Sequence, residues 1–140
     1  MGRILIGGDT SGSIDNETLS TFLGFMQQLC DEVNPSGVEV VWWDAAVAGV
    51  DVFEADNLKN LASAVRPAGG GGTDPSCVPS WLKKHPKKEE FVCAVMFTDG
   101  EFYKPDVGDW GDLPTLWMVV NNLKPPEIPV GKTIYVKDLE

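Results

Sequence analysis

The sequence is poor in histidine, in basic residues and in long apolar runs. It has one histidine, His85, among 140 residues, and 21 acidic residues outnumber its 11 lysines and arginines. The net charge of −10 would repel a phosphate backbone, which makes nucleic acid a poor partner. No apolar stretch approaches the ~18 residues of a membrane span, and the segment before Asp9 is too short for a signal peptide. We therefore expect a cytoplasmic protein with no membrane segment.

Cysteine is also scarce. Cys30, Cys77 and Cys93 are odd in number and show no CxxC spacing, so we expect reduced thiols rather than disulfides or a zinc site. The length suits one core, and we find neither an internal repeat nor a long linker. These features predict a single domain over residues 1–140.

The apolar pattern predicts strands that alternate with helices. Continuous apolar runs at residues 4–6 and 91–98 are typical of strands covered on both faces. An apolar stripe along residues 19–33 predicts a helix capped by Asp15 or Asn16. Further strands are predicted at residues 38–43, 47–53, 116–120 and 133–136, and further helices at residues 57–65 and 74–84. The expected fold is α/β and Rossmann-like, a mostly parallel sheet with one antiparallel edge strand and flanking helices.

Oxygen-bearing side chains follow two of these strands. The sequence Asp9-Thr10-Ser11-Gly12-Ser13 follows the first strand, and Asp99 follows the strand at residues 91–98. Thr73 comes after a run of four glycines and leads into a predicted helix. Because ligands gather at the carboxyl ends of parallel strands, we expect these side chains to converge on one edge of the sheet.

Two interpretations without a metal fit poorly. A serine nucleophile in a GxSxG turn needs glycine where Asp9 and Ser13 stand, and His85 lies in a lysine-rich segment away from Ser11. A phosphate loop ending at residues 131–133 needs glycine where Pro126 stands, and a strand rather than a helix is predicted to follow it.

A metal ion fits better. Asp9, Ser11, Ser13, Thr73 and Asp99 offer only oxygen, which favours Mg²⁺, or else Mn²⁺ or Ca²⁺, over zinc. Hydroxyl groups with one or two carboxylates leave such an ion short of negative charge, so a further anionic ligand from a partner is expected. The alternative is that the two serines only cap the following helix and that Asp9 binds a backbone N–H.

These segments resemble the metal-ion-dependent adhesion site of von Willebrand factor A (VWA) domains. Nearly the whole chain is similar to the VWA-like domain at the C-terminal end of bacterial and phage predicted metallopeptidases. The similarity is carried by Asp9-Thr10-Ser11-Gly12-Ser13, Gly70-Gly71-Gly72-Thr73-Asp74, Phe97-Thr98-Asp99-Gly100 and Pro114-Thr115-Leu116-Trp117.

The resemblance implies a role for each motif residue. Ser11 and Ser13 would bind the ion through their hydroxyls, and Thr73 would bind it directly or through water. Asp9 and Asp99 would hold the hydroxyls and waters in place. The remaining position on the ion would take a carboxylate from a partner protein.

Residues beside the motifs have supporting roles in this interpretation. Gly12 allows a tight bend between the two serines, and Gly72 and Gly100 would permit the loop geometry. Asp74 and Glu101 are candidates to contact the ligands of the ion rather than the ion itself. From its place in a polar loop, Trp110 is a candidate anchor for a partner.

Two departures from the family pattern matter. The longer members carry an HExxH peptidase domain, which a chain with one histidine cannot build, so protease activity is not carried over. The pair Gly7-Gly8 stands where aliphatic residues are usual, and it predicts close approach of another segment.

The sequence thus predicts a non-enzymatic, Mg²⁺-dependent protein-binding module. VWA proteins often work beside MoxR-type AAA⁺ ATPases, which makes such an ATPase a candidate partner by analogy. The alternatives are a metal-dependent hydrolase or phosphotransfer enzyme, which needs a general base near the ion, and a structural or assembly domain with a vestigial site.

Overall fold

A six-stranded sheet forms the centre of the protein. The computed structural model describes residues 2–101, 107–120 and 128–136. The strand order is β3-β2-β1-β4-β5-β6, and every neighbouring pair is parallel except β2 and β3. The strands are β1 (Arg3–Asp9), β2 (Gly37–Trp43), β3 (Val47–Glu54), β4 (Phe91–Thr98), β5 (Thr115–Val120) and β6 (Lys132–Val136). The predicted mostly parallel sheet with an antiparallel edge strand is confirmed.

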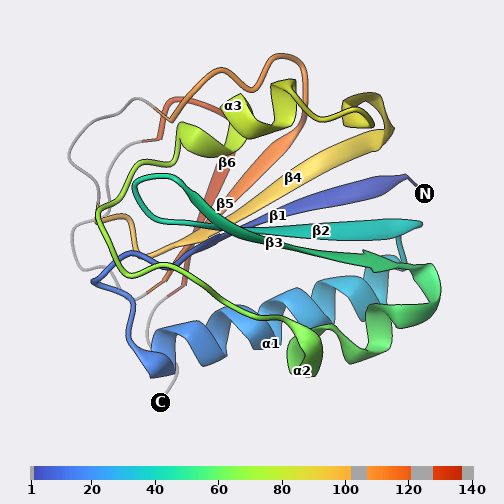
Figure 1. Cartoon of the computed structure of the whole chain (residues 1–140), viewed down its shortest axis with the longest axis horizontal. Helices are drawn as coiled ribbons and strands as arrows, with labels where there is room; N and C mark the ends of the chain where they lie inside the picture. Colours follow the sequence, from blue (N-terminus) through green and yellow to red (C-terminus); the bar gives the residue numbers. More distant parts are fainter. Residues whose placement is uncertain (1, 102–106, 121–127, 137–140) are drawn as a thin grey trace.

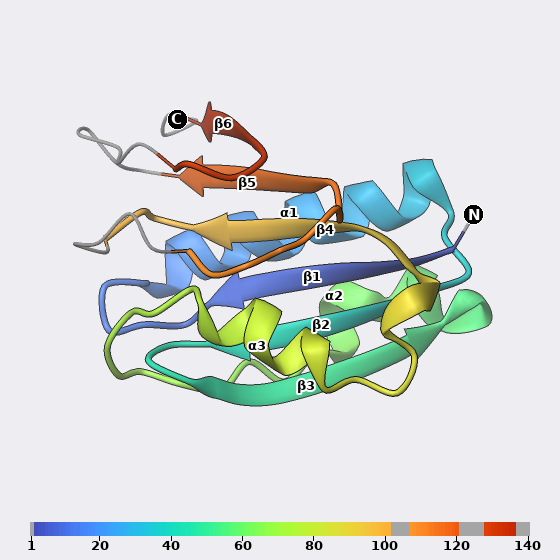
Figure 2. The ribbon, with the colours of Figure 1, turned by 90° about the horizontal axis from the view of Figure 1, so that it is seen from above.

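Helices cover both faces of the sheet. The long helix α1 (Asn16–Val33) lies on one face with α2 (Leu61–Ala64), and α3 (Cys77–Lys83) lies on the other (Figures 1 and 2). Two 3₁₀ turns, η1 (Ala55–Asn60) and η2 (Lys88–Glu90), complete the described elements. Because both faces are covered, all seven residues of β1 are buried, as its continuous apolar run predicts.

Each face has its own apolar cluster. Phe22 and Met26 of α1 pack with Trp42 and Phe97 on one side. On the other side, Val78 of α3 belongs to the cluster that contains Trp43, Met96 and Trp117. Successive strand residues such as Trp42 and Trp43 therefore serve opposite faces, since side chains alternate along a strand.

The limits of α1 follow from local chemistry. The Asp15 carboxylate accepts a hydrogen bond from the Thr18 backbone N–H at 2.7 Å, which confirms the predicted cap. Asn34 ends the helix in the left-handed conformation, with φ of 52°. No helix within the described residues combines the length and hydrophobicity of a bilayer span.

Two predicted helices are shorter than expected. Residues 57–65 form the end of η1 and the single turn of α2, because the Gln27 side chain bonds the Leu58 carbonyl and the Ala62 N–H, each at 2.9 Å. The helix predicted from Asp74 begins at Cys77 instead. The Asp74 carboxylate accepts hydrogen bonds from the N–H and hydroxyl of Ser76, which closes a turn before the helix.

The pair Gly7-Gly8 allows the close approach that the sequence predicts. A Cβ at Gly7 would clash with the Met96 thioether, and a Cβ at Gly8 would clash with the Trp42 ring. Large side chains from the two neighbouring strands thus occupy the space that these glycines leave, directly behind Asp9.

Candidate metal centre

The candidate centre lies where β1 and β4 end side by side. Asp9 is the last residue of β1, and its side chain is fully buried. Its Oδ1 accepts hydrogen bonds from the Ser11 N–H at 2.8 Å and from the Ser11 hydroxyl at 2.6 Å. Its Oδ2 accepts one from the hydroxyl of Thr98, the last residue of β4, at 2.6 Å. Both carboxylate oxygens are therefore held in place by protein donors.

Ser11 and Ser13 point toward one another. Their Oγ atoms lie 3.3 Å apart, with Ser11 buried and Ser13 exposed. The Gly12 N–H between them donates to the Gly71 carbonyl oxygen at 2.9 Å. The Ile14 N–H also donates to the Ser11 carbonyl oxygen at 3.0 Å, so Gly12 lies in a tight turn, as the sequence predicts, and it does so without a positive φ.

Asp99 adds negative charge beside Asp9. It is 7% exposed, and its Oδ1 accepts a hydrogen bond from the Glu101 N–H at 3.1 Å. Burial raises the pKa of Asp9, hydrogen bonds from Ser11 and Thr98 act against this, and the charge of Asp99 raises the Asp9 pKa further. A bound cation would relieve the burial penalty and the repulsion together.

Gly100 and Glu101 follow Asp99 in the chain. Gly100 has a φ of 74°, which favours glycine, and its N–H donates to the Thr98 hydroxyl at 3.0 Å. This conformation is the kind of loop geometry that glycine permits, and the role of Gly100 at an ion site stays a prediction. The Glu101 side chain is exposed.

A second loop, residues 68–74, is tied to this centre and is called here the glycine loop. The Thr10 hydroxyl donates to the carbonyl oxygens of Ala68 at 2.5 Å and Trp43 at 3.1 Å. On the far side of the loop, Asp44 takes two backbone N–H groups: its Oδ2 accepts from Gly71 at 3.0 Å, and its carbonyl oxygen accepts from Asp74 at 2.8 Å.

Thr73 lies in this tied segment. Its side chain is half-buried, and within the described residues no hydrogen bond joins it to Asp9, Ser11 or Ser13. The structure thus brings four of the five predicted ligands into one hydrogen-bonded and electrostatic cluster. It places Thr73 on a loop that is bonded to that cluster through Gly12.

The supporting residues of the glycine loop differ from expectation. Gly72 has no positive φ, whereas Gly69 and Gly70 do, with values of 139° and 126°. The conformation that favours glycine therefore falls earlier in the run than position 72, and the predicted role of Gly72 stays a prediction. The exposed Asp74 carboxylate bonds Ser76, so it organises the turn before α3.

Sequence reasoning missed Thr98, Thr10 and Asp44. Thr98 precedes Asp99 at a strand end, and alternation along the strand is the signal that would have placed its hydroxyl near Asp9. Thr10 and Asp44 bond the glycine loop, which is distant from both in the sequence, and no sequence motif predicts these contacts.

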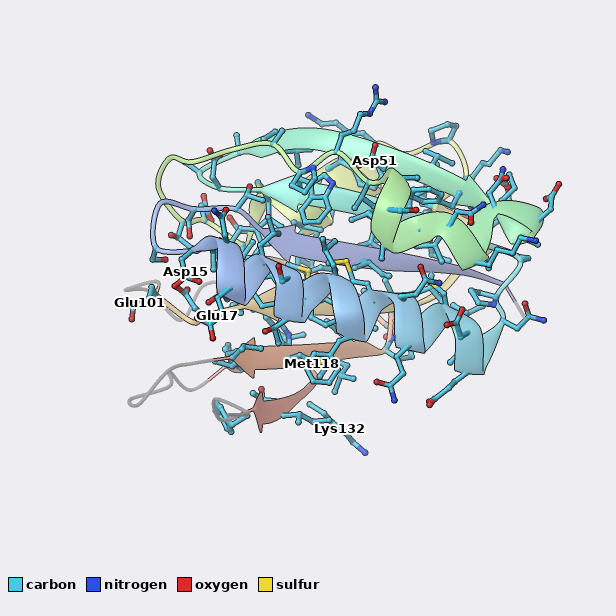
Figure 3. The ribbon with its side chains drawn as sticks, turned by 90° about the horizontal axis from the view of Figure 1, so that it is seen from below. Asp15, Glu17, Asp51, Glu101, Met118 and Lys132 are labelled. Carbon is cyan, nitrogen blue, oxygen red and sulfur yellow. The ribbon has the colours of Figure 1, made fainter. Side chains whose placement is uncertain are left out.

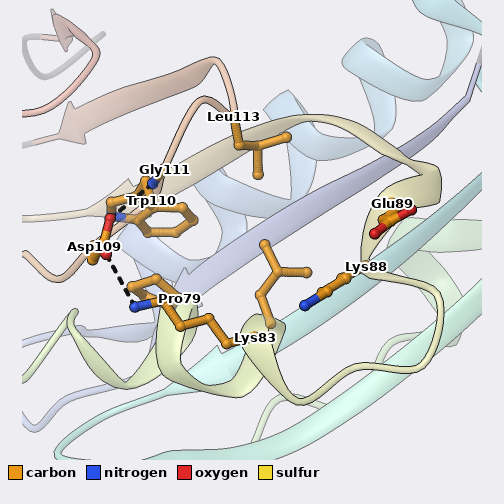
Figure 4. A pocket seen from close by; sticks show the side chains of 9 residues that line it. Pro79, Lys83, Lys88, Glu89, Asp109, Trp110, Gly111 and Leu113 are labelled. Carbon is orange, nitrogen blue, oxygen red and sulfur yellow. Dashed lines mark hydrogen bonds and ion pairs between the residues drawn. The ribbon is translucent and has the colours of Figure 1, made fainter.

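Trp110 does not form an exposed anchor. Its side chain is 5% exposed, its indole N–H donates to the Val107 carbonyl oxygen at 2.9 Å, and its ring meets Trp117 edge-on at a centroid distance of 6.1 Å. Figure 4 shows it in the wall of a hollow of about 240 Å³ beside α3. The prediction for Trp110 is wrong because the ring completes the apolar cluster on that face.

His85 lies at the opposite end of the molecule. Its Nε2 is 2.8 Å from a carboxylate oxygen of Glu39, a β2 residue that pairs with Leu5, whereas Asp9 pairs with Trp43 at the far end of β2. The Lys87 N–H donates to Nδ1 of His85. His85 is therefore bonded to Glu39 at the other end of the sheet, where it cannot act as the base for Ser11.

The donor set fits a hard cation. An octahedral Mg²⁺ with ligands at about 2.1 Å places neighbouring ligand atoms about 3 Å apart, close to the 3.3 Å between the two serine oxygens. In the part of the chain that the structure describes, no three His, Cys, Asp or Glu side chains gather in a manner that would hold a metal. Any ion here would therefore depend on hydroxyl oxygens.

Comparison with known proteins gives one finding. Residues 4–137 match the model of a protein family described as VWA-like domain (DUF2201). No curated protein matches the chain significantly.

Proposed function

The chain belongs to the VWA-like domain family, and from this premise we propose that it is a non-enzymatic protein-binding module that acts through a bound Mg²⁺ ion. The ion occupies a metal-ion-dependent adhesion site made by Asp9, Ser11, Ser13, Thr73 and Asp99. Mn²⁺ and Ca²⁺ prefer the same oxygen donors and are expected to substitute.

The spacing of the Ser11 and Ser13 oxygens carries this proposal. Two hydroxyls 3.3 Å apart match two neighbouring positions of an octahedral ion. If these serines only capped α1, one of their hydroxyls would accept the cap hydrogen bond, yet it is the Asp15 carboxylate that accepts it from the Thr18 N–H.

The distribution of charge explains why a partner is needed. Both oxygens of Asp9 are engaged by Ser11 and Thr98, so Asp9 orients the hydroxyls and the ion gains little direct charge from it. Thr73, on the tethered glycine loop, supplies another neutral oxygen. When bound, the ion supplies a positive charge that a carboxylate from another protein can neutralise.

The proposed partner is a protein that presents an aspartate or glutamate. We include a MoxR-type AAA⁺ ATPase among the candidates because of the family resemblance, and we place the interaction in the cytoplasm. A hydrolase would need a general base near the ion, for which Asp99, Glu101 and Asp74 are the candidates. The Asp74 carboxylate already accepts two hydrogen bonds from Ser76, and we propose that none of the three acts as a base.

The direct test is a titration of EDTA-treated ¹⁵N-labelled protein with Mg²⁺, followed by Mn²⁺. We expect Mg²⁺ to shift the amide signals of residues 9–13, 71–74 and 98–101, and paramagnetic Mn²⁺ to broaden the same signals. The double variant Ser11→Ala/Ser13→Ala should lose both effects, whereas Ser20→Ala/Ser63→Ala, which changes two exposed serines outside the centre, should keep them. Unchanged Mg²⁺ affinity in the first variant would refute the site.

A further inference from the structure

A hollow adjoins the candidate ion site on the α1 side. Its volume is about 410 Å³, and one wall is formed by Ser11 and Gly12. Pro67 and Ala68, at the start of the glycine loop, form the opposite wall. A partner whose carboxylate reaches an ion on Ser11 would therefore lie next to this hollow, because the two share Ser11.

The third wall is apolar. It consists of Ile14 and Leu19, which stand at the positions directly before the Asp15 cap and four residues into α1. Apolar residues at these two positions commonly pack together as a hydrophobic staple. Both side chains are half-buried and pack against the apolar cluster between α1 and the sheet, which holds them in place.

The hollow is uncharged in a strongly acidic chain. None of the described residues that line it carries a charge, although the protein has a net charge of −10. Exposed carboxylates lie beyond it: Figure 3 shows Asp15, Glu17 and Glu101 at the same end of the molecule. A second acidic group on the partner would meet these charges, whereas an apolar side chain would meet uncharged groups, among them the apolar side chains of Ile14, Leu19, Pro67 and Ala68.

The glycine loop offers backbone groups to an incoming chain. Within the described ranges, neither Gly69 nor Gly70 takes part in a backbone hydrogen bond, and no atom lies within 4 Å of a Cβ built on Gly70. A partner main chain can therefore approach this side of the hollow closely.

We propose that the partner segment carries one carboxylate residue with a bulky aliphatic residue two positions away, and that the aliphatic side chain fills this hollow. The spacing follows from an extended chain, in which residues i and i+2 face the same side about 7 Å apart. The inference rests on the proposed function, because the ion fixes where the carboxylate sits. In this proposal the hollow determines which carboxylate-bearing segments the protein binds.

The test uses two capped nonapeptides in saturating Mg²⁺. One has a central glutamate with leucine two residues to either side, and the other has serine in place of both leucines, with glycine and serine elsewhere. From the burial of one leucine side chain, we expect the leucine peptide to bind about tenfold more tightly in an NMR titration. Equal affinities, or no binding of the leucine peptide at millimolar concentration, would overturn the inference.

A matched pair of variants locates the preference. Ile14→Thr makes the wall of the hollow polar, and Ile134→Thr makes the same change on β6 at an exposed residue that does not line the hollow. We expect Ile14→Thr to reduce the leucine preference about threefold or more and Ile134→Thr to leave it unchanged. A preference that survives Ile14→Thr would contradict the assignment.

EDTA separates this inference from the proposed function. If the leucine peptide bound equally well in EDTA and lost its preference in Ile14→Thr, the hollow would stand and the bridging ion would fail. If Mg²⁺ bound and both peptides required it equally, the ion would stand and the hollow would fail.

Discussion

The Thr98 hydroxyl donates to Asp9 Oδ2 at 2.6 Å and joins the ends of β1 and β4. The same Thr98 oxygen accepts the Gly100 N–H at 3.0 Å, so it also sets the turn that carries Asp99. One buried hydroxyl thus fixes the carboxylate that orients Ser11 and the start of the segment that supplies the second carboxylate. Thr98 would therefore affect a bound ion only indirectly, by positioning Asp9 and the segment that carries Asp99.

Thr98→Val tests this positioning role. The change keeps the side-chain shape but removes the hydrogen bond, and we expect Mg²⁺ affinity to fall about 10–100-fold, as for other residues that orient metal ligands. Thr115→Val removes another buried hydroxyl, at the start of the adjacent strand β5, which donates a hydrogen bond to the Leu113 carbonyl oxygen. Calorimetry should show a normal Mg²⁺ affinity for Thr115→Val, and an equal loss in both variants would indicate general destabilisation.

Asp9→Asn should stabilise the metal-free protein. Burial raises the Asp9 pKa, so the fold favours the protonated form, and that stabilisation is present below the ordinary pKa of about 3.9 and lost as pH rises through the folded-state value. At pH 7 the ionised carboxylate therefore opposes folding, and the neutral amide should relieve this.

Thermal unfolding in EDTA measures the effect. We expect a higher Tm for Asp9→Asn than for the native protein at pH 7, by about 4 °C for each kcal/mol relieved, with the difference shrinking toward pH 4. Mg²⁺ should raise the Tm of the native protein only. A lower Tm for Asp9→Asn at pH 7 would show that its hydrogen bonds outweigh its charge.

Asp44→Ala should loosen the glycine loop. Hydrogen bonds from the Ala46 and Gly71 N–H groups lower the Asp44 pKa, and the bond to Gly71 is lost in the variant. We expect faster amide exchange across residues 69–74 and a Mg²⁺ affinity about 3–10-fold weaker, because Thr73 is no longer presented in one position.

Asp109→Ala is the matched control for Asp44→Ala. This exposed carboxylate also accepts a backbone N–H, from Gly111, and its pKa is lowered by that bond and by Lys83. Since it lies beside α3 in the other hollow, its loss should not change Mg²⁺ affinity. Normal amide exchange of the glycine loop in Asp44→Ala would contradict the role of Asp44.

Gly8→Ala should destabilise the fold, whereas Gly24→Ala should stabilise it. A Cβ at Gly8 would overlap the Trp42 ring, and such overpacking costs about 1–3 kcal/mol. A Cβ at Gly24 meets nothing within 4 Å on α1, and replacing a helix glycine by alanine gains about 0.5–1 kcal/mol. Urea unfolding of both variants measures these opposite changes.

The elements that could be predicted from the sequence are those fixed by neighbouring residues. The cap at Asp15 acts on Thr18, three residues away, and the burial of β1 follows from its own apolar run. The convergence of Asp9 with Asp99 needed one further rule, that parallel strands end at the same edge. Each of these conclusions depends on chemistry visible within a few positions or on a general property of parallel sheets.

What escaped prediction depends on contacts between distant residues. The Gln27 amide shapes the segment from Leu58 to Ala62, and the Asp44 carboxylate holds Gly71, 27 positions later. Trp110 was assigned to the surface because polar residues surround it in the sequence, yet it belongs to a buried cluster with Leu5 and Val78, which are distant in the sequence. A local pattern cannot reveal partners that only the folded chain brings near.

The position of β1 between β2 and β4 has a consequence for synthesis. During translation Asp9 and Ser11 leave the ribosome before β2, which can pair with β1 soon afterwards. Thr98 and Asp99 follow almost ninety residues later. A nascent chain that ends before β4 therefore lacks Thr98 and Asp99, and the metal-dependent binding proposed above would require the residues through β4 to have emerged.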